Sequence, residues 1–346
     1  MGAISMRSSS LVLCGVLALS VSACKSTSGS GAAKEDLALV PKETDIVLMA
    51  NVKRMRNTAM WRKILDVRDS DPQAKKDYDD FVAKCALDPF KQIDSVFVAF
   101  PQSGPEAKPD QKEFAAILRG QFNEQKLVDC AKEQAKKDGR DVTTTDYNGK
   151  KLYTDNQKAE AWATFLDSKT AVVGGKEWVK KVVDLAAKKD GESAKNNAEL
   201  SALLKRARTS DALWGAGLVP QTTRDSFKND PRLSSAASMK DIFGSVDFAS
   251  GVTSELNVDT GSEADAKDLV SKATAQVADI RKSPQFMMMG LAQYLDGIKI
   301  DNKAATFHLS INYTQQQVDD LINRVTGLLT RFGGAMGGMP MQPPSP

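Results

Sequence analysis

Residues 11–21, LVLCGVLALSV, form a mostly apolar run near the amino terminus of the 346-residue chain. Arg7 is the only charged residue before this run, and small residues follow it. The run is too short to span a bilayer as a mature helix, so it predicts a secretory signal that is removed after export. Export constrains the rest of the chain, because the remaining residues must then fold in an oxidising compartment.

The junction after the apolar run is Val21-Ser22-Ala23-Cys24. It resembles the lipobox of bacterial lipoproteins, in which a pair of small residues precedes an obligatory cysteine. The resemblance implies diacylglycerol attachment to the Cys24 sulfur, cleavage that removes residues 1–23, and acylation of the new amino group. The alternative is an ordinary signal peptide with a chance cysteine, and Met6 is an alternative start.

Residues 24–36 are rich in Ser, Gly and Ala and show no apolar period, which predicts a flexible tether. Several acyl chains would anchor such a tether stably. The membrane is therefore the first expected partner. The sequence places the protein at a bacterial membrane, on the periplasmic face or the cell surface, and does not separate inner from outer membrane.

The charge balance argues against a nucleic-acid partner. The chain has 47 Lys+Arg against 44 Asp+Glu, a formal net charge of +3 at pH 7, which is no strong electrostatic footprint for a chain of this size. It contains one histidine, which excludes a metal centre built from several imidazoles. We expect no cofactor and no metal site.

Two cysteines remain for the folded body. Cys14 leaves with the signal and Cys24 carries lipid, so Cys85 and Cys130 form an even pair in an oxidising setting. A bridge between them would close a loop of about 45 residues and stabilise the fold by about 4 kcal/mol on the chain-entropy estimate. Two buried free thiols are the alternative.

The periodicities predict an α+β fold with short antiparallel sheets covered by amphipathic helices. Asn148-Gly149 joins two short runs and predicts a tight β-hairpin. The expected strands are 45–52, 93–100, 114–119, 142–147, 150–154, 160–166, 170–173, 212–219, 246–249, 252–258, 298–302 and 305–313. The expected helices are 58–67, 72–85, 123–137, 176–188, 200–208, 232–243, 264–280, 285–295 and one that starts at a capping box of Thr314 and Gln317.

The two halves of the body, 37–192 and 193–332, show a similar order of elements, and each ends with a hairpin that leads into an amphipathic helix. An internal duplication explains this order, and chance is the other explanation, because the two halves share few identical residues. Residues 333–346 are Gly-, Met- and Pro-rich and predict a disordered tail.

Asp259-Thr260-Gly261-Ser262 resembles the signature of aspartic proteases. In those enzymes two aspartates share a proton. Because the chain has no second copy of the motif, only a homodimer would pair Asp259 with a like residue. The simpler interpretation is a strand, a turn and a helix capped by Ser262, with Asp265 at its third position.

Other motifs have structural explanations. Gly174-Gly175-Lys176 lacks the spacing of a phosphate loop and predicts a tight turn before a helix. The methionines at 287–289 are expected to fill core space. Met336, Met339 and Met341 have a spacing that suits Cu(I), although Gly/Pro-rich tails often carry methionine without it. His308 lies between inward-facing residues and is expected to face solvent.

The mature chain also resembles uncharacterised cell-envelope lipoproteins of the myxobacterial type, through Cys85-x-x-Asp88-Pro89, Gly120-x-Phe122 and a cysteine in the next helix. This resemblance implies no activity. We therefore expect a lipid-anchored envelope protein without a catalytic site, which binds a protein or a small apolar ligand or has a structural role. The alternative is an envelope hydrolase that uses carboxylate or Ser/Lys chemistry, the homodimeric protease at Asp259 being its remote form.

Overall fold

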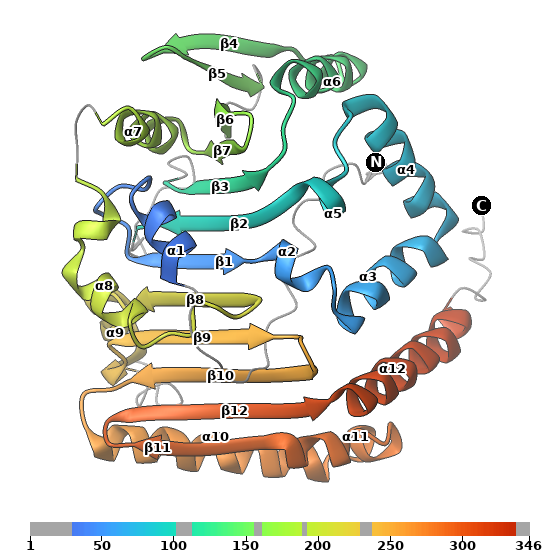
Figure 1. The fold of residues 1–346 in the computed structure, drawn as a ribbon. Helices are drawn as coiled ribbons and strands as arrows, with labels where there is room; N and C mark the ends of the chain where they lie inside the picture. Colours follow the sequence, from blue (N-terminus) through green and yellow to red (C-terminus); the bar gives the residue numbers. More distant parts are fainter. Residues whose placement is uncertain (1–29, 102–112, 156–160, 189–191, 229–236, 337–346) are drawn as a thin grey trace, which may run out of the picture.

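The computed structural model describes residues 30–101, 113–155, 161–188, 192–228 and 237–336 (Figure 1). These residues combine helices with one antiparallel sheet, so the α+β class is confirmed. The prediction of several short sheets is wrong. Twelve strands form one continuous sheet in the order β11-β12-β10-β9-β8-β1-β2-β3-β7-β6-β5-β4. The strands are short as predicted, but they pair across the whole chain.

The strands are β1 (Ile46–Ala50), β2 (Ile93–Phe100), β3 (Ala115–Gly120), β4 (Val142–Tyr147), β5 (Lys150–Asp155), β6 (Trp162–Asp167), β7 (Thr170–Gly174), β8 (Leu213–Leu218), β9 (Asp241–Asp247), β10 (Gly251–Asp259), β11 (Ile298–Lys303) and β12 (Thr306–Thr314). The helices are α1 (Ser30–Leu37), α2 (Val52–Met55), α3 (Ala59–Ser70), α4 (Pro72–Cys85), α5 (Pro89–Gln92), α6 (Glu124–Lys137), α7 (Lys176–Ala186), η1 (Ala194–Asn196), α8 (Ala198–Leu204), α9 (Gln221–Lys228), α10 (Glu263–Lys282), α11 (Pro284–Met288), η3 (Ala292–Gly297) and α12 (Gln315–Met336).

The two halves of the chain meet in the middle of the sheet, where β1 pairs with β8 over residues 46–50 and 213–217. Moving outward from this junction, one half gives β1, β2, β3, β7, β6 and the other gives β8, β9, β10, β12, β11. In both halves the third strand pairs with the second strand of the closing hairpin. A duplication would produce this order, and it stays a prediction.

The main core lies on one face of the central strands. Val47, Phe97 and Ile117 alternate with half-buried neighbours and have no exposed surface. They pack in one cluster with Trp178 of α7 and Leu200 of α8, and Figure 1 shows α7 beside β6 and β7 and α8 beside β8. The alternation follows from the two-residue period of a strand, which sends successive side chains to opposite faces.

Three predicted boundaries change. The predicted tether 24–36 is wrong over residues 30–36, which form α1 together with Leu37, and Asp36 is buried; residues 24–29 lie outside the described part of the chain. The helix predicted over 232–243 is wrong at residues 241–243, which begin β9 between β8 and β10, and its residues 232–236 lie outside the described part of the chain. Helix α12 runs through Met336, four residues into the predicted tail 333–346; residues 337–346 lie outside the described part of the chain.

Candidate functional site

Asp259 is the last residue of β10 and lies in a polar cluster at one end of the sheet. Thr306 begins β12 and lies directly opposite Asp259, while Asp241 begins β9 and lies opposite it on the other side. Arg206 comes from the chain just after α8. The fold therefore brings to Asp259 three groups that are 18 to 53 residues away from it in sequence.

Arg206 holds the Asp259 carboxylate from two directions. Its Nη2 donates to Oδ1 at 2.8 Å, and its Nη1 donates to Oδ2. The Thr306 hydroxyl donates to Oδ1 at 2.7 Å. The guanidinium carbon of Arg206 also lies 4.7 Å from the centre of the Phe243 ring. A bidentate pair of this kind fixes both the charge and the orientation of the carboxylate.

The two aspartates have opposite electrostatic environments. Burial alone would raise the pKa of Asp259, but the hydrogen bonds from Arg206 and Thr306 and the charge of Arg206 hold it below its usual value. Burial raises the pKa of Asp241, and the neighbouring Asp259 carboxylate raises it further. One carboxyl group is therefore held ionised, while the other keeps its proton more readily.

This geometry argues against an aspartic protease centre. A protease dyad shares one proton between two carboxyl groups, whereas the Asp259 carboxylate is committed to Arg206. The turn after it follows the simpler prediction: the Ser262 hydroxyl accepts a hydrogen bond from the Asp265 amide at 3.2 Å and caps α10. Sequence reasoning missed Asp241 because it placed this residue in a helix.

A second polar network crosses the same half of the sheet. Arg54 of α2 donates to both carboxylate oxygens of Asp247 at 2.6 and 2.7 Å. The buried Ser245 hydroxyl donates to Asp211 at 2.8 Å. Burial raises the pKa of Asp211, partly offset by this hydrogen bond. These contacts join α2 to β9 and β9 to the start of β8, so they stabilise the fold.

His308 is not the solvated side chain that the sequence predicts. Its side chain is 27% exposed, with Nδ1 3.2 Å from an Asp301 oxygen and Nε2 3.9 Å from a Glu255 oxygen. Glu255 in turn accepts a hydrogen bond from Arg208 at 2.5 Å. Within the described residues, no group of three or more His, Cys, Asp or Glu side chains is arranged to hold a metal ion.

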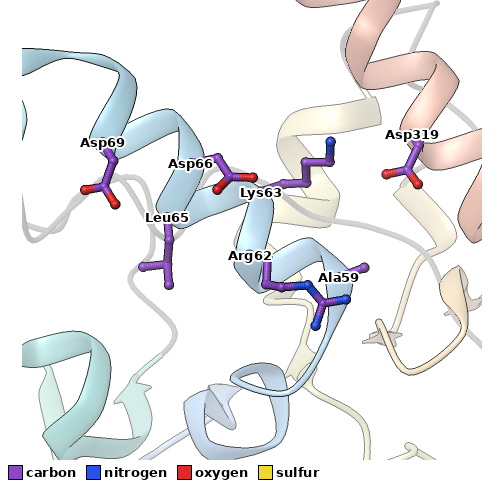
Figure 2. A pocket seen from close by; sticks show the side chains of 7 residues that line it. All are labelled: Ala59, Arg62, Lys63, Leu65, Asp66, Asp69 and Asp319. Atoms are coloured by element: carbon purple, nitrogen blue, oxygen red, sulfur yellow. The ribbon is translucent and has the colours of Figure 1, made fainter.

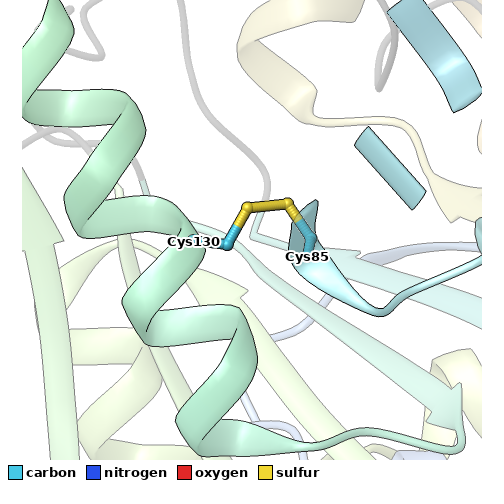
Figure 3. The surroundings of a disulfide bond; sticks show 2 residues. All are labelled: Cys85 and Cys130. Carbon is cyan, nitrogen blue, oxygen red and sulfur yellow. A yellow bond between two sulfur atoms is a disulfide. The ribbon is translucent and has the colours of Figure 1, made fainter. Parts of the chain in front are cut away.

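Cys85 and Cys130 form a disulfide, with their Cα atoms 5.0 Å apart (Figure 3). Cys85 is the last residue of α4 and Cys130 lies in the middle of α6. The bond joins the helix that precedes β2 and β3 in the sequence to a helix that follows them, and it forms the bridge that the even pair of cysteines predicts.

A shallow depression lies between α3 and α12. It has a volume of about 450 Å³ and is lined by Arg62, Lys63, Asp66, Asp69 and Asp319 together with Ala59 and Leu65 (Figure 2). Asp319 accepts a hydrogen bond from Gln315 at 3.2 Å. The charged lining and open form do not suit a small apolar ligand, which needs an apolar enclosure.

The other residues that the sequence singled out do not lie together in one site. Cys24 lies outside the described residues, as do Met339 and Met341, while Met336 ends α12. Gly175 and Lys176 form the predicted helix start, and the Lys176 ammonium lies 4.7 Å above the Trp162 ring.

The prediction that residues 287–289 fill core space is wrong for its first two members. The five-residue helix α11 leaves Met287 61% and Met288 84% exposed.

The comparisons with known proteins yield structural neighbours alone. Neither a family model nor a curated protein sequence matches the chain. Three crystal forms of TP0453, forms III, I and IV, are similar at TM-scores of 0.45, 0.42 and 0.43 and identities of 12%, 10% and 11%. The alignments cover 83% of this chain and 95–96% of TP0453. At these scores the likeness is too loose to carry an argument about function. Within the described residues, no helix has the length and apolarity needed to cross a membrane.

Proposed function

We propose that the protein is a lipid-anchored component of the bacterial cell envelope whose folded body acts by binding or by structure, without catalysis. The observation that carries the non-catalytic part is the bidentate Arg206–Asp259 pair. It engages the carboxylate of the one protease-like motif in the sequence. A carboxylate that is fixed by a guanidinium is a poor proton acceptor, because ionisation is already stabilised.

The junction between anchor and body supports the membrane part of the proposal. Residues 25–29 alone separate Cys24 from α1. Helix α1 is fastened to the sheet by Asp36, whose side chain is 2% exposed and accepts hydrogen bonds from Arg119 Nε at 2.9 Å and Nη2 at 2.6 Å. A lipid on Cys24 would therefore hold the body close to the bilayer surface, within about 20 Å for so short a linker.

A protein partner suits this body better than a small apolar ligand. The described depression between α3 and α12 is charged and open. Polar and charged residues that lie at an open surface are the usual rim of a protein–protein interface.

One observation favours the alternative of a carboxylate hydrolase. The pKa values of Asp241 and Asp259 move apart, which is the pattern of an acid and a base that act together. In such an enzyme Asp241 would donate a proton and Asp259 would activate water, after release from Arg206.

The full acylated chain in detergent micelles, screened against peptide, ester and glycoside substrates, separates the two candidates. We expect no turnover above that of a matched preparation in which both Asp241 and Asp259 are replaced by Asn. Turnover that disappears in Asp259→Asn or Asp241→Asn, but remains in the exposed-site control Asp225→Asn, would overturn the non-catalytic proposal. Turnover that is lost with a Ser→Ala change would do the same through Ser/Lys chemistry.

A further inference from the structure

Strand β4 is one of the two edges of the sheet and is unusually bare. Among the described strands it pairs with β5 alone, and residues 143–146 are exposed on both faces. In the described residues, β5 pairs with β6 at Tyr153 and Thr154, and the Thr164 hydroxyl of β6 donates to the Lys151 carbonyl of β5 at 2.9 Å. Figure 1 shows the β4–β5 hairpin lying at the margin of the molecule beside α6. Strand β4 is therefore an open edge of the sheet to which a further strand can pair.

The turn determines which backbone groups of β4 face outward. Asn148 and Gly149 have φ of 46° and 77°, the conformation of a two-residue type I′ turn. Such a turn makes the flanking pair Tyr147 and Lys150 hydrogen-bonded, and bonding then alternates along the ladder. The amides and carbonyls of Val142, Thr144 and Asp146 therefore point away from β5.

These outward groups are largely unoccupied by the described part of the protein. The Val142 amide donates to the Asp141 side chain at 2.8 Å. Neither the Thr144 nor the Asp146 backbone makes an outward hydrogen bond to another described residue. The opposite edge, β11, is different, because it carries exposed Lys299 and Lys303. Lysines on an edge discourage pairing with another chain, and β4 has neither Lys nor Pro to do so.

We propose that β4 pairs antiparallel with β4 of a second copy of this chain, with Thr144 opposite Thr144 of the second copy. The outward residues are spaced evenly at 142, 144 and 146, so a twofold axis at Thr144 superimposes this set on itself. Val142 then faces Asp146 of the second copy, and the reverse. The three pairs provide about six backbone hydrogen bonds, once Asp141 releases the Val142 amide.

The side chains are compatible with this register. Asp146 faces Val142, and Asp141 faces Tyr147, so no two like charges lie directly opposite each other. Thr144 faces itself, and Thr143 faces Thr145, which are favourable cross-strand pairs. A contact with twofold symmetry is complete in a dimer. Pairing of β4 with β11 of another copy would instead leave one free edge at each end and build a filament. The side-chain pairing in this register, with Thr144 facing Thr144 and no like charges opposed, is what favours a second copy over an unrelated extended peptide. This proposal does not depend on the proposed function.

Cross-linking in intact membranes tests the register with the full acylated chain. Thr144→Cys should give a covalent dimer with a short bismaleimide, at a yield about tenfold above that of Lys299→Cys on the other edge, because paired Cβ atoms lie within about 5.5 Å. Thr143→Cys and Thr145→Cys should cross-link poorly when each is expressed alone and well when they are expressed together. Equal yields at Thr144 and Lys299 would overturn the proposal.

Introduction of a like charge at the centre of the proposed contact supplies the second test. Thr144→Lys places two lysines opposite each other and should weaken the dimer about tenfold in sedimentation of the detergent-solubilised chain. Lys299→Glu should leave the dimer unchanged. Because residue 144 is exposed, the unfolding midpoint of Thr144→Lys should match that of the unaltered chain. A monomeric unaltered chain, a dimer indifferent to Thr144→Lys, or filaments would each refute the pairing.

Discussion

Asp241 and Asp259 lie directly opposite each other across β9 and β10, yet the pKa of one is raised and that of the other is lowered. The difference comes from Arg206, which is bound to Asp259 through both guanidinium Nη atoms. Two like charges on paired strand positions repel. The fold therefore accommodates this pair because Arg206 compensates the charge of Asp259, while the Asp259 carboxylate raises the pKa of Asp241.

Asp241→Asn and Asp259→Asn should have opposite effects on stability at neutral pH. Asp259 has a lowered folded pKa, so its contribution is present above the unfolded value of about 4 and is lost as pH falls through the folded pKa. Asp241 has a raised folded pKa, so stability declines as pH rises through that value.

At pH 7, Asp259→Asn should therefore lower the free energy of unfolding by about 1 kcal/mol, a figure that allows for the exposed Arg206. Asp241→Asn should raise it by less than about 1 kcal/mol. Urea unfolding of both variants between pH 3 and pH 7 checks the signs, and the two curves should converge at the acid end. Destabilisation by both variants at pH 7 would contradict the account.

Arg119→Met should destabilise the fold by about 2–4 kcal/mol, because it leaves the Asp36 carboxylate buried without its ion partner. The double variant Asp36→Leu with Arg119→Met should recover part of the loss, since it removes the uncompensated charge. Arg62→Met, at an exposed position of α3, is the matched control and should have little effect. Urea unfolding midpoints measure all three, and equal midpoints for Arg119→Met and Arg62→Met would show that the pair is unimportant.

Loss of the Cys85–Cys130 disulfide should lower the free energy of unfolding by about 4 kcal/mol, from the 45-residue separation that the bond closes. The variant with both cysteines replaced by Ala should match the reduced unaltered protein in denaturant titration. The reductant should have no effect on the variant itself. If neither reduction nor replacement of both cysteines changed the free energy of unfolding, then opening this loop would not increase the conformational entropy of the unfolded chain, and the prediction would be wrong.

Cys24→Ala should abolish incorporation of a fatty-acid analogue and release the protein from the membrane fraction. The physical reason is that the acyl chains on Cys24 are the proposed anchor, and several chains are needed for stable attachment. Cys14→Ala, within the predicted signal, is the control and should label like the unaltered chain. Labelling that persists in Cys24→Ala would remove the lipoprotein assignment.

Local signals in the sequence predicted most individual elements. Helix α4 begins with Pro72 at its first position and ends at Cys85, as its apolar spacing indicates. The capping box at Thr314 forms, with the Thr314 amide donating to Gln317 at 2.9 Å. In each case the stabilising groups are close in sequence, so the pattern contains the information.

What the sequence missed depends on distant partners. Strand β9 was predicted as helix over its first three residues because it shows no clear alternation, and its place is determined by β8 and β10 on either side. Because of this error, the sequence did not predict that Asp241 lies opposite Asp259. Helix α1 was assigned to a tether because its composition is that of a linker, while its attachment depends on Arg119 from β3. Pairing between β1 and β8 has no local signal at all.

The β1–β8 junction has a consequence for the timing of folding. In the proposed export, amino end first, β1 would cross the membrane long before β8, its partner across the junction, which begins at Leu213. During that interval β1 exposes a row of unpaired amides and carbonyls, so the first half of the protein has an open sheet edge that other chains can join. The sheet is completed, and this hazard ends, when the second half arrives; late-forming contacts of this kind are slow to fold. Protection of the β1 edge until β8 arrives would therefore favour correct folding over association with other chains.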